Sequence, residues 1–241
     1  MPEHFGRYIQ RVGVELEGLW LKPSRLCGGI WHHDGSVDVR DDSSEDGHDV
    51  DDGDQGEYVS QPCSNRMQLE RFVLDNYPDY VNESCGLHVH ISFRHPKYRA
   101  YTEEYAFYEA YLSAMKDIGE VLGMRSAHHY WKRWRGEPLL DQDHSYCARE
   151  WKPDLQFDGR DHGEARYCHL NYCYRKHGTL ENRMLPMFHK PETALKAVLA
   201  YCTWVEEYLK ERNKLPEFAT EAVAEVAMPE SRAEERILVT V

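Results

Sequence analysis

The chain has 241 residues, of which 41% are hydrophobic and 29% are charged, which is the balance of an ordinary globular protein. This composition excludes collagen-like, coiled-coil and fully disordered chains, and a chain of this length needs no disulfide or metal in order to fold. The net charge of −13 comes largely from residues 38–54, where nine acidic residues stand against one arginine. The remainder has no basic stripe, which argues against nucleic-acid binding.

No apolar run approaches the roughly 20 residues of a membrane-spanning helix, and residues 1–10 lack the apolar stretch of a signal peptide. The seven cysteines are scattered without a CxxC pair, which argues against a disulfide framework or a structural zinc site. We therefore expect a cytoplasmic protein with no membrane partner, folded as a single domain over residues 1–241. A flexible acidic loop at 38–54 and a C-terminal tail after about residue 215 are expected to lie outside its core.

In the first half of the chain, the hydrophobic pattern predicts four strands and one helix. Residues 11–20 alternate apolar and polar side chains, which is typical of a strand with one apolar face. Two short strands are expected on either side of the acidic loop, with a turn at Asp34. Residues 64–77 have helical spacing with Ser64 as N-cap, and residues 86–93 form a second alternating strand.

In the second half, the pattern predicts two long helices with a hairpin between them. Residues 102–122 form a helix capped by Thr102, and residues 192–212 form another that follows Pro191. Residues 166–175 and 179–185 are two strands that turn at His177 and Gly178, whereas residues 124–160 lack a period and predict loops. The expected fold is α+β, with helices covering the apolar face of a sheet.

Three of the predicted strands carry a pair of polar residues two positions apart, opposite their apolar side chains. The pairs are Glu15 with Glu17, His88 with His90, and Glu181 with Arg183. If the strands lie in one sheet, all three pairs point into a common volume. Two carboxylates about 4 Å apart repel by about 4 kcal/mol at an effective dielectric of about 20, and a divalent cation removes that penalty. Oxygen ligands with a single histidine favour Mg²⁺ or Mn²⁺ over Zn²⁺, and a guanidinium suits a phosphoryl oxygen.

Each pair has an ordinary explanation when it is taken alone. A Glu-x-Glu strand is more often a solvated face than a metal site, and a His-x-His pair is as often hydrogen-bonded without a metal. The joint occurrence of three pairs favours one shared site. A further cluster is either a lid over an anionic substrate or a surface loop anchored by tryptophan, and it consists of Arg125, His128, His129, Trp131, Arg133, Trp134 and Arg135.

These segments resemble the amidoligase family, which is related to glutamine synthetase and glutamate cysteine ligase within the carboxylate-amine ligase superfamily. The matching motifs are GVELEG at Gly13, DGS at Asp34 with GEYVSQP at Gly56, CGLHVHIS at Cys85, and RYCHLNYCYRKHGTLENRML at Arg166. They follow the family's order. The resemblance implies a glutamine synthetase-like catalytic fold, in which a curved, mainly antiparallel sheet binds ATP and magnesium on its concave face and carries helices on its convex face.

The resemblance also implies a set of metal ligands. Glu15, His88 and Glu181 would share a metal, Mg²⁺ or Mn²⁺, that bridges nucleotide phosphates. Glu17 and Glu57 would hold a metal on the side of the acyl group. The chain departs from its larger relatives here, because Glu57 is its only clear counterpart of the further acids that those relatives use for the second metal.

The implied reaction is the ATP-dependent formation of an amide or peptide-like bond between a small-molecule, peptide or protein carboxylate and an amine, through an acyl phosphate. Arg166, Asn171 and Arg183 would contact phosphate or substrate, and Arg183 would also stabilise the transferred phosphoryl group. His90 would contact the carboxylate substrate. Glu57 and His90 are both candidates for the base that takes a proton from the amine.

Two other functions remain open from the residues alone. The same acids and histidines would serve a metal-dependent hydrolase, of the amidase or phosphatase type, in which the metals activate water. A noncatalytic binding module that keeps the fold is the third reading, although the three intact pairs argue against it. Active sites shared between subunits are common among the relatives, so a homo-oligomer is compatible with the resemblance.

Overall fold

The structure is a computed structural model that describes residues 4–34, 36–39, 53–82, 84–123 and 168–214. Over these residues the chain is an α+β protein with a six-stranded sheet and four α-helices, which confirms the predicted fold class. The expectations for residues 40–52, for the cluster at 125–135, for Arg166 and for the tail after residue 215 lie outside the described residues. None of the described helices combines the length and the apolar character needed to cross a membrane.

The sheet is antiparallel between every pair of neighbours, in the order β2-β3-β1-β4-β6-β5. Its strands are β1 (Ile9–Trp20), β2 (Gly29–His32), β3 (Asp54–Ser60), β4 (Gly86–Phe93), β5 (Leu170–Cys173) and β6 (Thr179–Pro186). The strands predicted at 11–20, 86–93 and 179–185 are confirmed within two residues. The predicted turn at His177 and Gly178 is also confirmed, since Gly178 has a φ of +70°, which favours glycine.

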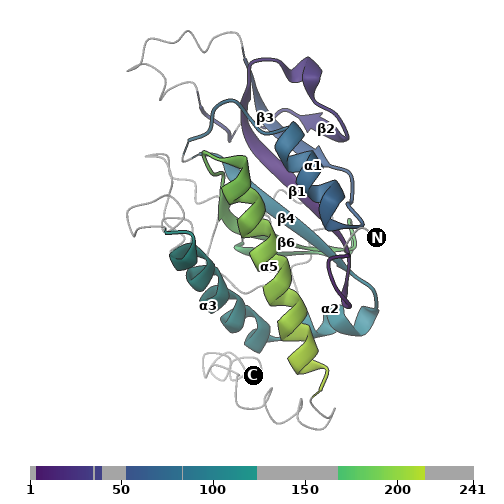
Figure 1. The fold of residues 1–241 in the computed structure, drawn as a ribbon. Helices are drawn as coiled ribbons and strands as arrows, with labels where there is room; N and C mark the ends of the chain where they lie inside the picture. The colour runs from purple at the N-terminus through teal and green to yellow at the C-terminus, as the bar shows by residue number, and fades with distance from the viewer. Residues whose placement is uncertain (1–3, 35, 40–52, 83, 124–167, 215–241) are drawn as a thin grey trace, which may run out of the picture.

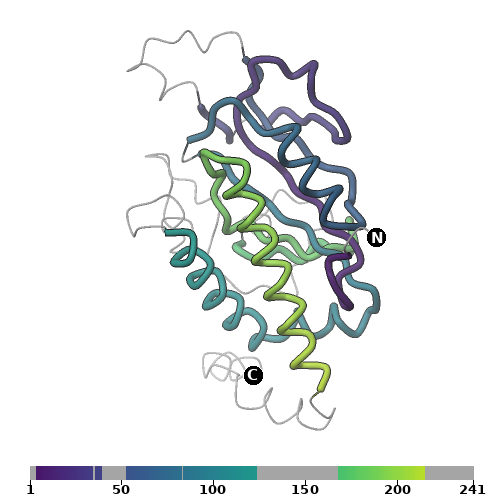
Figure 2. Tube along the Cα trace, viewed as in Figure 1, coloured from purple at the N-terminus to yellow at the C-terminus, as the bar shows by residue number. Residues whose placement is uncertain are grey.

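Helices lie on one side of this sheet. They are α1 (Arg66–Asp75), α2 (Pro96–Thr102), α3 (Tyr105–Val121) and α5 (Pro191–Arg212). In Figure 1, α5 runs across the sheet with α1 on one side of it and α3 on the other, and Figure 2 traces the same arrangement along the backbone. The side chains of Val14, Leu16, Val89 and Ile91 are fully buried in the core that joins this face to the helices. The opposite face is therefore the one that carries the polar pairs.

Two predicted helix starts are wrong, for local reasons. The N-cap of α1 is Asn65 rather than Ser64, because the Asn65 side chain accepts a hydrogen bond of 3.0 Å from the Gln68 backbone N–H. Ser64 instead donates its backbone N–H to Gln68 Oε1 at 2.8 Å. Thr102 ends the separate helix α2, and its hydroxyl donates to the Arg99 carbonyl oxygen, so α3 begins only at Tyr105.

The start of β1 and the two residues before it are attached to α5 through one carboxylate. Glu206 accepts hydrogen bonds from three successive backbone N–H groups, those of Arg7 at 2.8 Å, Tyr8 at 2.8 Å and Ile9 at 2.6 Å. Gly6 precedes them with a φ of +148°, and a side chain at Gly6 would meet the Glu206 carboxylate. The start of the strand that carries Glu15 is thus fixed to the longest helix among the described residues.

This anchor predicts a specific loss of stability. We expect Glu206→Ala to lower the free energy of unfolding by about 2 kcal/mol, because three N–H groups lose a charged acceptor. Urea denaturation at pH 7 measures the effect. Glu207→Ala is the matched control, since the neighbouring Glu207 side chain is 60% exposed and pairs only with Lys210 among the contacts described for it. Equal unfolding midpoints for the two variants would contradict the anchoring role.

Candidate metal centre

The strand pairing brings the predicted polar pairs together on the face away from the helices. Glu15 of β1 stands opposite His88 of β4, and His90 of β4 stands opposite Glu181 of β6. On the other side of β1, Glu17 stands opposite Glu57 of β3. Directly opposed residues on one face of an antiparallel sheet have side chains within contact distance. The register therefore assembles acids and imidazoles from four neighbouring strands into one site.

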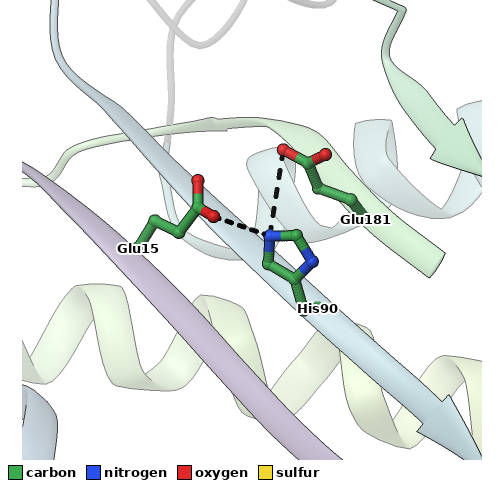
Figure 3. Close-up of side chains that lie close together, drawn as sticks. All are labelled: Glu15, His90 and Glu181. Carbon is green, nitrogen blue, oxygen red and sulfur yellow. Dashed lines mark hydrogen bonds and ion pairs between the residues drawn. The ribbon is translucent and has the colours of Figure 1, made fainter. Parts of the chain in front are cut away.

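Glu15, His90 and Glu181 form the first cluster. The Nε2 atom of His90 lies 2.9 Å from Glu15 Oε1 and 4.0 Å from Glu181 Oε1, and Figure 3 shows this nitrogen between the two carboxylates. The three ligand atoms lie within 4.8 Å of one another. One nitrogen and two carboxylate oxygens at this spacing could hold a divalent cation.

Glu17, Asp34 and Glu57 form the second cluster, in which three carboxylate oxygens again lie within 4.8 Å of one another. Glu17 is 3% exposed, and one of its oxygens accepts a hydrogen bond from the Gly86 backbone N–H. Asp34 accepts hydrogen bonds on Oδ1 from the backbone N–H and the hydroxyl of Ser36, which fixes its carboxylate. An all-oxygen donor set is the kind that Mg²⁺ and Mn²⁺ prefer.

His88 connects the two clusters. Its Nδ1 atom lies 2.8 Å from Glu15 Oε2 and 3.7 Å from Glu181 Oε1, and its Nε2 atom lies 3.4 Å from Glu17 Oε1. The ring is only 2% exposed, so it has no freedom to turn toward solvent. His88 is thus in reach of both clusters at once, and the predicted grouping of Glu15, His88 and Glu181 is present in the structure.

Neighbouring groups fix the orientation of Glu181. Its Oε2 atom accepts hydrogen bonds from Asn171 Nδ2 at 3.0 Å and from the Cys173 thiol at 3.3 Å. Its Oε1 atom faces His90 and accepts a hydrogen bond of 2.8 Å from Arg183 Nη1. Asn171, predicted as a phosphate or substrate contact, here contacts a carboxylate of the first cluster. One oxygen of Glu181 is therefore held by β5, and the other is presented to the site.

Crowding of the acids shows in the ionisation of Glu57. Burial raises its pKa, and the nearby carboxylates of Glu15, Glu17 and Asp34 raise it further, to about 8. A carboxyl group with such a pKa is protonated at neutral pH unless a cation replaces the proton. Binding of a divalent ion by the second cluster would therefore release a proton from Glu57.

The first cluster is already partly neutralised by its own imidazoles. Burial alone would lower the pKa of His90, but Glu15 and Glu181 outweigh burial and raise it to about 9. Burial alone would raise the pKa of Glu15, but His90 and His88 hold it well below its ordinary value. The pKa of Glu181 is likewise lowered despite burial, chiefly by Arg183. A protonated His90 imidazole and the Arg183 guanidinium together offset the charges of these two carboxylates.

Two cavities lie over this face, with volumes of about 590 Å³ and about 330 Å³. The smaller cavity is lined by members of both clusters together with two cationic side chains, those of Lys176 and Arg183. The larger cavity is lined by Arg11, Ser92 and Thr179 among others, and it contains no carboxylate except Glu15 among its described lining residues. Both cavities share Glu15 and His90. The first cluster thus stands where two binding volumes meet.

The sequence reasoning missed two members of this site. One is Asp34, for which the sequence predicts only a turn. Its carboxylate lies with those of Glu17 and Glu57 in the second cluster, and its DGS motif, a point of the resemblance, is the signal that could have found it. The other is Cys173, which lies two positions from Asn171 on β5 and so faces the same side.

Comparisons with models of known protein families, with curated proteins and with solved structures gave no match, so the amidoligase resemblance stays a prediction.

The raised pKa values predict how metal and pH act on stability. Glu57 and His90 bind their protons more tightly in the folded chain than in the unfolded chain, where their pKa values are about 4.5 and 6.5. Their contribution to the free energy of unfolding is complete below the unfolded-chain pKa values. It is lost as the pH rises through the folded-chain values of about 8 for Glu57 and about 9 for His90. With EDTA present, we expect the melting temperature to fall by about 5 °C between pH 7 and pH 9.

Calorimetry at a series of pH values tests this expectation, with and without Mn²⁺. The metal should abolish the fall, because it takes the place of the protons. Glu57→Gln should show a smaller fall in EDTA between pH 7 and pH 8 than the unchanged chain. A melting temperature that rises with pH in EDTA, or that Mn²⁺ does not change at pH 8, would argue against a metal centre.

Proposed function

We propose that the chain is an ATP-dependent carboxylate-amine ligase with a glutamine synthetase-like fold, which forms an amide or peptide-like bond through an acyl phosphate. The observation that carries the proposal is the assembly of Glu15, His88 and Glu181 on one face of an antiparallel sheet, beside the second cluster and Arg183. The order of the amidoligase-like motifs in the sequence supports the same function. The proposal does not depend on a P-loop, because this type of fold binds ATP without one.

The charges of the two clusters suit two divalent cations bound together with phosphate. The two clusters contain five carboxylates, and the guanidinium of Arg183 offsets one of these charges. Two divalent ions would neutralise the remaining charge, and bound metals would supply electrostatic stabilisation of the phosphate oxygens. Glu15 and Glu181, with an imidazole of His88 or His90, fit the first ion.

The second ion fits Glu17, Asp34 and Glu57, on the side that the resemblance assigns to the acyl group. Asp34 would supply a third oxygen ligand here, and its presence supports the proposal because Glu57 was the one clear counterpart in the sequence. Glu57 would serve either as a ligand or as the base for the amine. His90 lines both cavities, which supports a contact with the carboxylate substrate beside its place in the first cluster.

The chemistry follows from the poor leaving group of a carboxylate. Transfer of the terminal phosphoryl group of ATP to the carboxylate gives ADP and an acyl phosphate, and attack by the amine then releases phosphate and forms the amide. Arg183 is placed to stabilise the phosphoryl group in transfer, since its guanidinium lines the smaller cavity beside Glu181. With divalent ions bound, Glu57 or His90 would lose its own proton and could then take the proton that the amine loses.

The direct test uses purified protein with ATP, Mg²⁺ and a mixture of amino acids and amines. We expect ADP formation that requires Mg²⁺ and is coupled to a new mass, the sum of acid and amine less one water. Glu17→Gln should lower the rate by at least about 100-fold, because a buried charged ligand is lost. Glu120→Gln, an exposed acid on α3, is the control and should leave the rate unchanged.

The outcomes separate the candidate functions. Hydrolysis of an amide or a phosphate ester without nucleotide consumption would replace the proposal with the metal-dependent hydrolase. No turnover, with or without nucleotide, would leave a noncatalytic binding module. A coupled product that forms equally well with Glu17→Gln would show that the reaction does not use the second cluster.

A further inference from the structure

Strand β6 contains an extra residue at the site, between Asn182 and Leu185. On β4, Leu87 pairs with Leu185 and Val89 pairs with Asn182, so two steps along β4 match three steps along β6. Arg183 and Met184 therefore both stand opposite His88, which is the definition of a β-bulge. Bulges next to functional sites commonly redirect a side chain. Here the side chain at the bulge is the only arginine that lines the smaller cavity of the candidate metal centre among the described residues.

At the bulge, two backbone N–H groups of β6 donate to acceptors outside β4. The Met184 N–H donates to Asn182 Oδ1 at 2.9 Å. An asparagine side chain that accepts from the backbone N–H two residues later forms an Asx-turn. The Arg183 N–H donates to the His169 carbonyl oxygen at 3.0 Å. Without such acceptors each buried N–H would lose about 1–3 kcal/mol of solvation, so the bulge depends on them.

Asn182 is itself held from the helix side of the sheet. Its side chain is fully buried, and its Oδ1 atom lies 2.8 Å from the Tyr111 hydroxyl, which also lies 2.9 Å from the His169 carbonyl oxygen. Its Nδ2 atom donates to the sulfur of Met115 at 3.2 Å. Both partners belong to α3, on the far side of the sheet from the metal ligands. Asn182 thus joins α3 to the backbone of the bulge.

The consequence falls on Arg183. Its Nη1 atom lies 2.8 Å from Glu181 Oε1 and 3.4 Å from His88 Nδ1, so small changes in its backbone would carry the guanidinium away from the first cluster. Glu181 precedes the bulge and is held independently by Asn171 and by Cys173. The bulge therefore controls the cationic side chain more directly than it controls the carboxylate ligands.

We propose that Asn182 is a positioning residue, which fixes the bulge from the helix side and so directs Arg183 into the candidate metal centre. The expected effect on catalysis rests on the proposed ligase function, whereas the placement of the Arg183 side chain by Asn182 does not. The chemistry of the position explains the residue type. An acceptor is needed for the Met184 N–H, and a neutral side chain is needed in a core that excludes water.

The variants separate loss of position from loss of folding. Asn182→Leu keeps the size and removes the acceptor, whereas Asn182→Asp keeps the acceptor and, in a core without water, holds its proton and stays neutral. We expect Asn182→Leu to lower kcat by about 100-fold with little change in KM for ATP, because a misplaced catalytic group chiefly affects the transition state. Asn182→Asp should recover most of kcat. Val198→Ala, a core truncation in α5, controls for general destabilisation and should leave kcat unchanged.

A double-mutant cycle tests whether Asn182 acts through Arg183. Arg183→Met alone should lower kcat about as much as Asn182→Leu does. In the double variant the second substitution should add little, because the two residues form one unit. Multiplied losses in the double variant would show that Asn182 acts by another route, and they would overturn the proposal.

A measurement that needs no activity completes the test. In protein labelled with ¹⁵N-arginine, the Nε–H resonance that disappears in Arg183→Met belongs to Arg183. It should shift in Asn182→Leu and return toward its original position in Asn182→Asp. Should Asn182→Leu not fold, Tyr111→Phe removes one partner of Asn182 and should shift the same resonance in the same direction.

The two proposals fail in different ways. A shifted Arg183 resonance in a protein without ligase activity would support the positioning role and overturn the proposed function. Full activity and an unshifted resonance in Asn182→Leu would overturn the positioning role and leave the ligase intact.

Discussion

Like charge held at close range is the constraint on which this structure depends. The sheet brings Glu15, Glu17 and Glu181 onto one face, where burial removes most of the water that would screen them. The protein offsets part of the repulsion with His88, His90 and the guanidinium of Arg183. The raised pKa of Glu57 shows that the offset is incomplete. A face built in this way is stable only with protons or cations bound, which links ligation directly to folding.

The sequence predicted the parts of the fold that depend on short-range pattern. Alternation in residues 11–20 and 86–93 predicts the two central strands, and the spacing of the polar pairs predicts that Glu15, His88 and Glu181 share one face, as they do. Period-two alternation fixes which side of a strand a residue occupies, and this property holds whatever the partner strand is. The same reasoning placed the helices over the apolar face.

Features that depend on tertiary contacts were not accessible from the sequence. Asp34 follows a short edge strand, so the pairing of β2 with β3 brings its carboxylate to Glu17 and Glu57, while the bonds from Ser36 fix its orientation. The N-cap is Asn65 and not the predicted Ser64, because the backbone N–H and the hydroxyl of Ser64 both donate to Gln68 Oε1. The bulge in β6 left one sign only, the adjacent buried Met184 and Leu185, since two neighbours in a regular strand cannot share a face.

The bond between Glu206 and the start of β1 joins groups about 200 residues apart in the chain, since the Tyr8 contact spans 198 positions. The start of β1 therefore gains its hydrogen bonds to Glu206 only after this part of α5 has been synthesised. Contacts of such sequence separation slow folding, because a long loop must close before any of them forms. On the ribosome, the start of β1 would stay without this anchor until synthesis has passed residue 206.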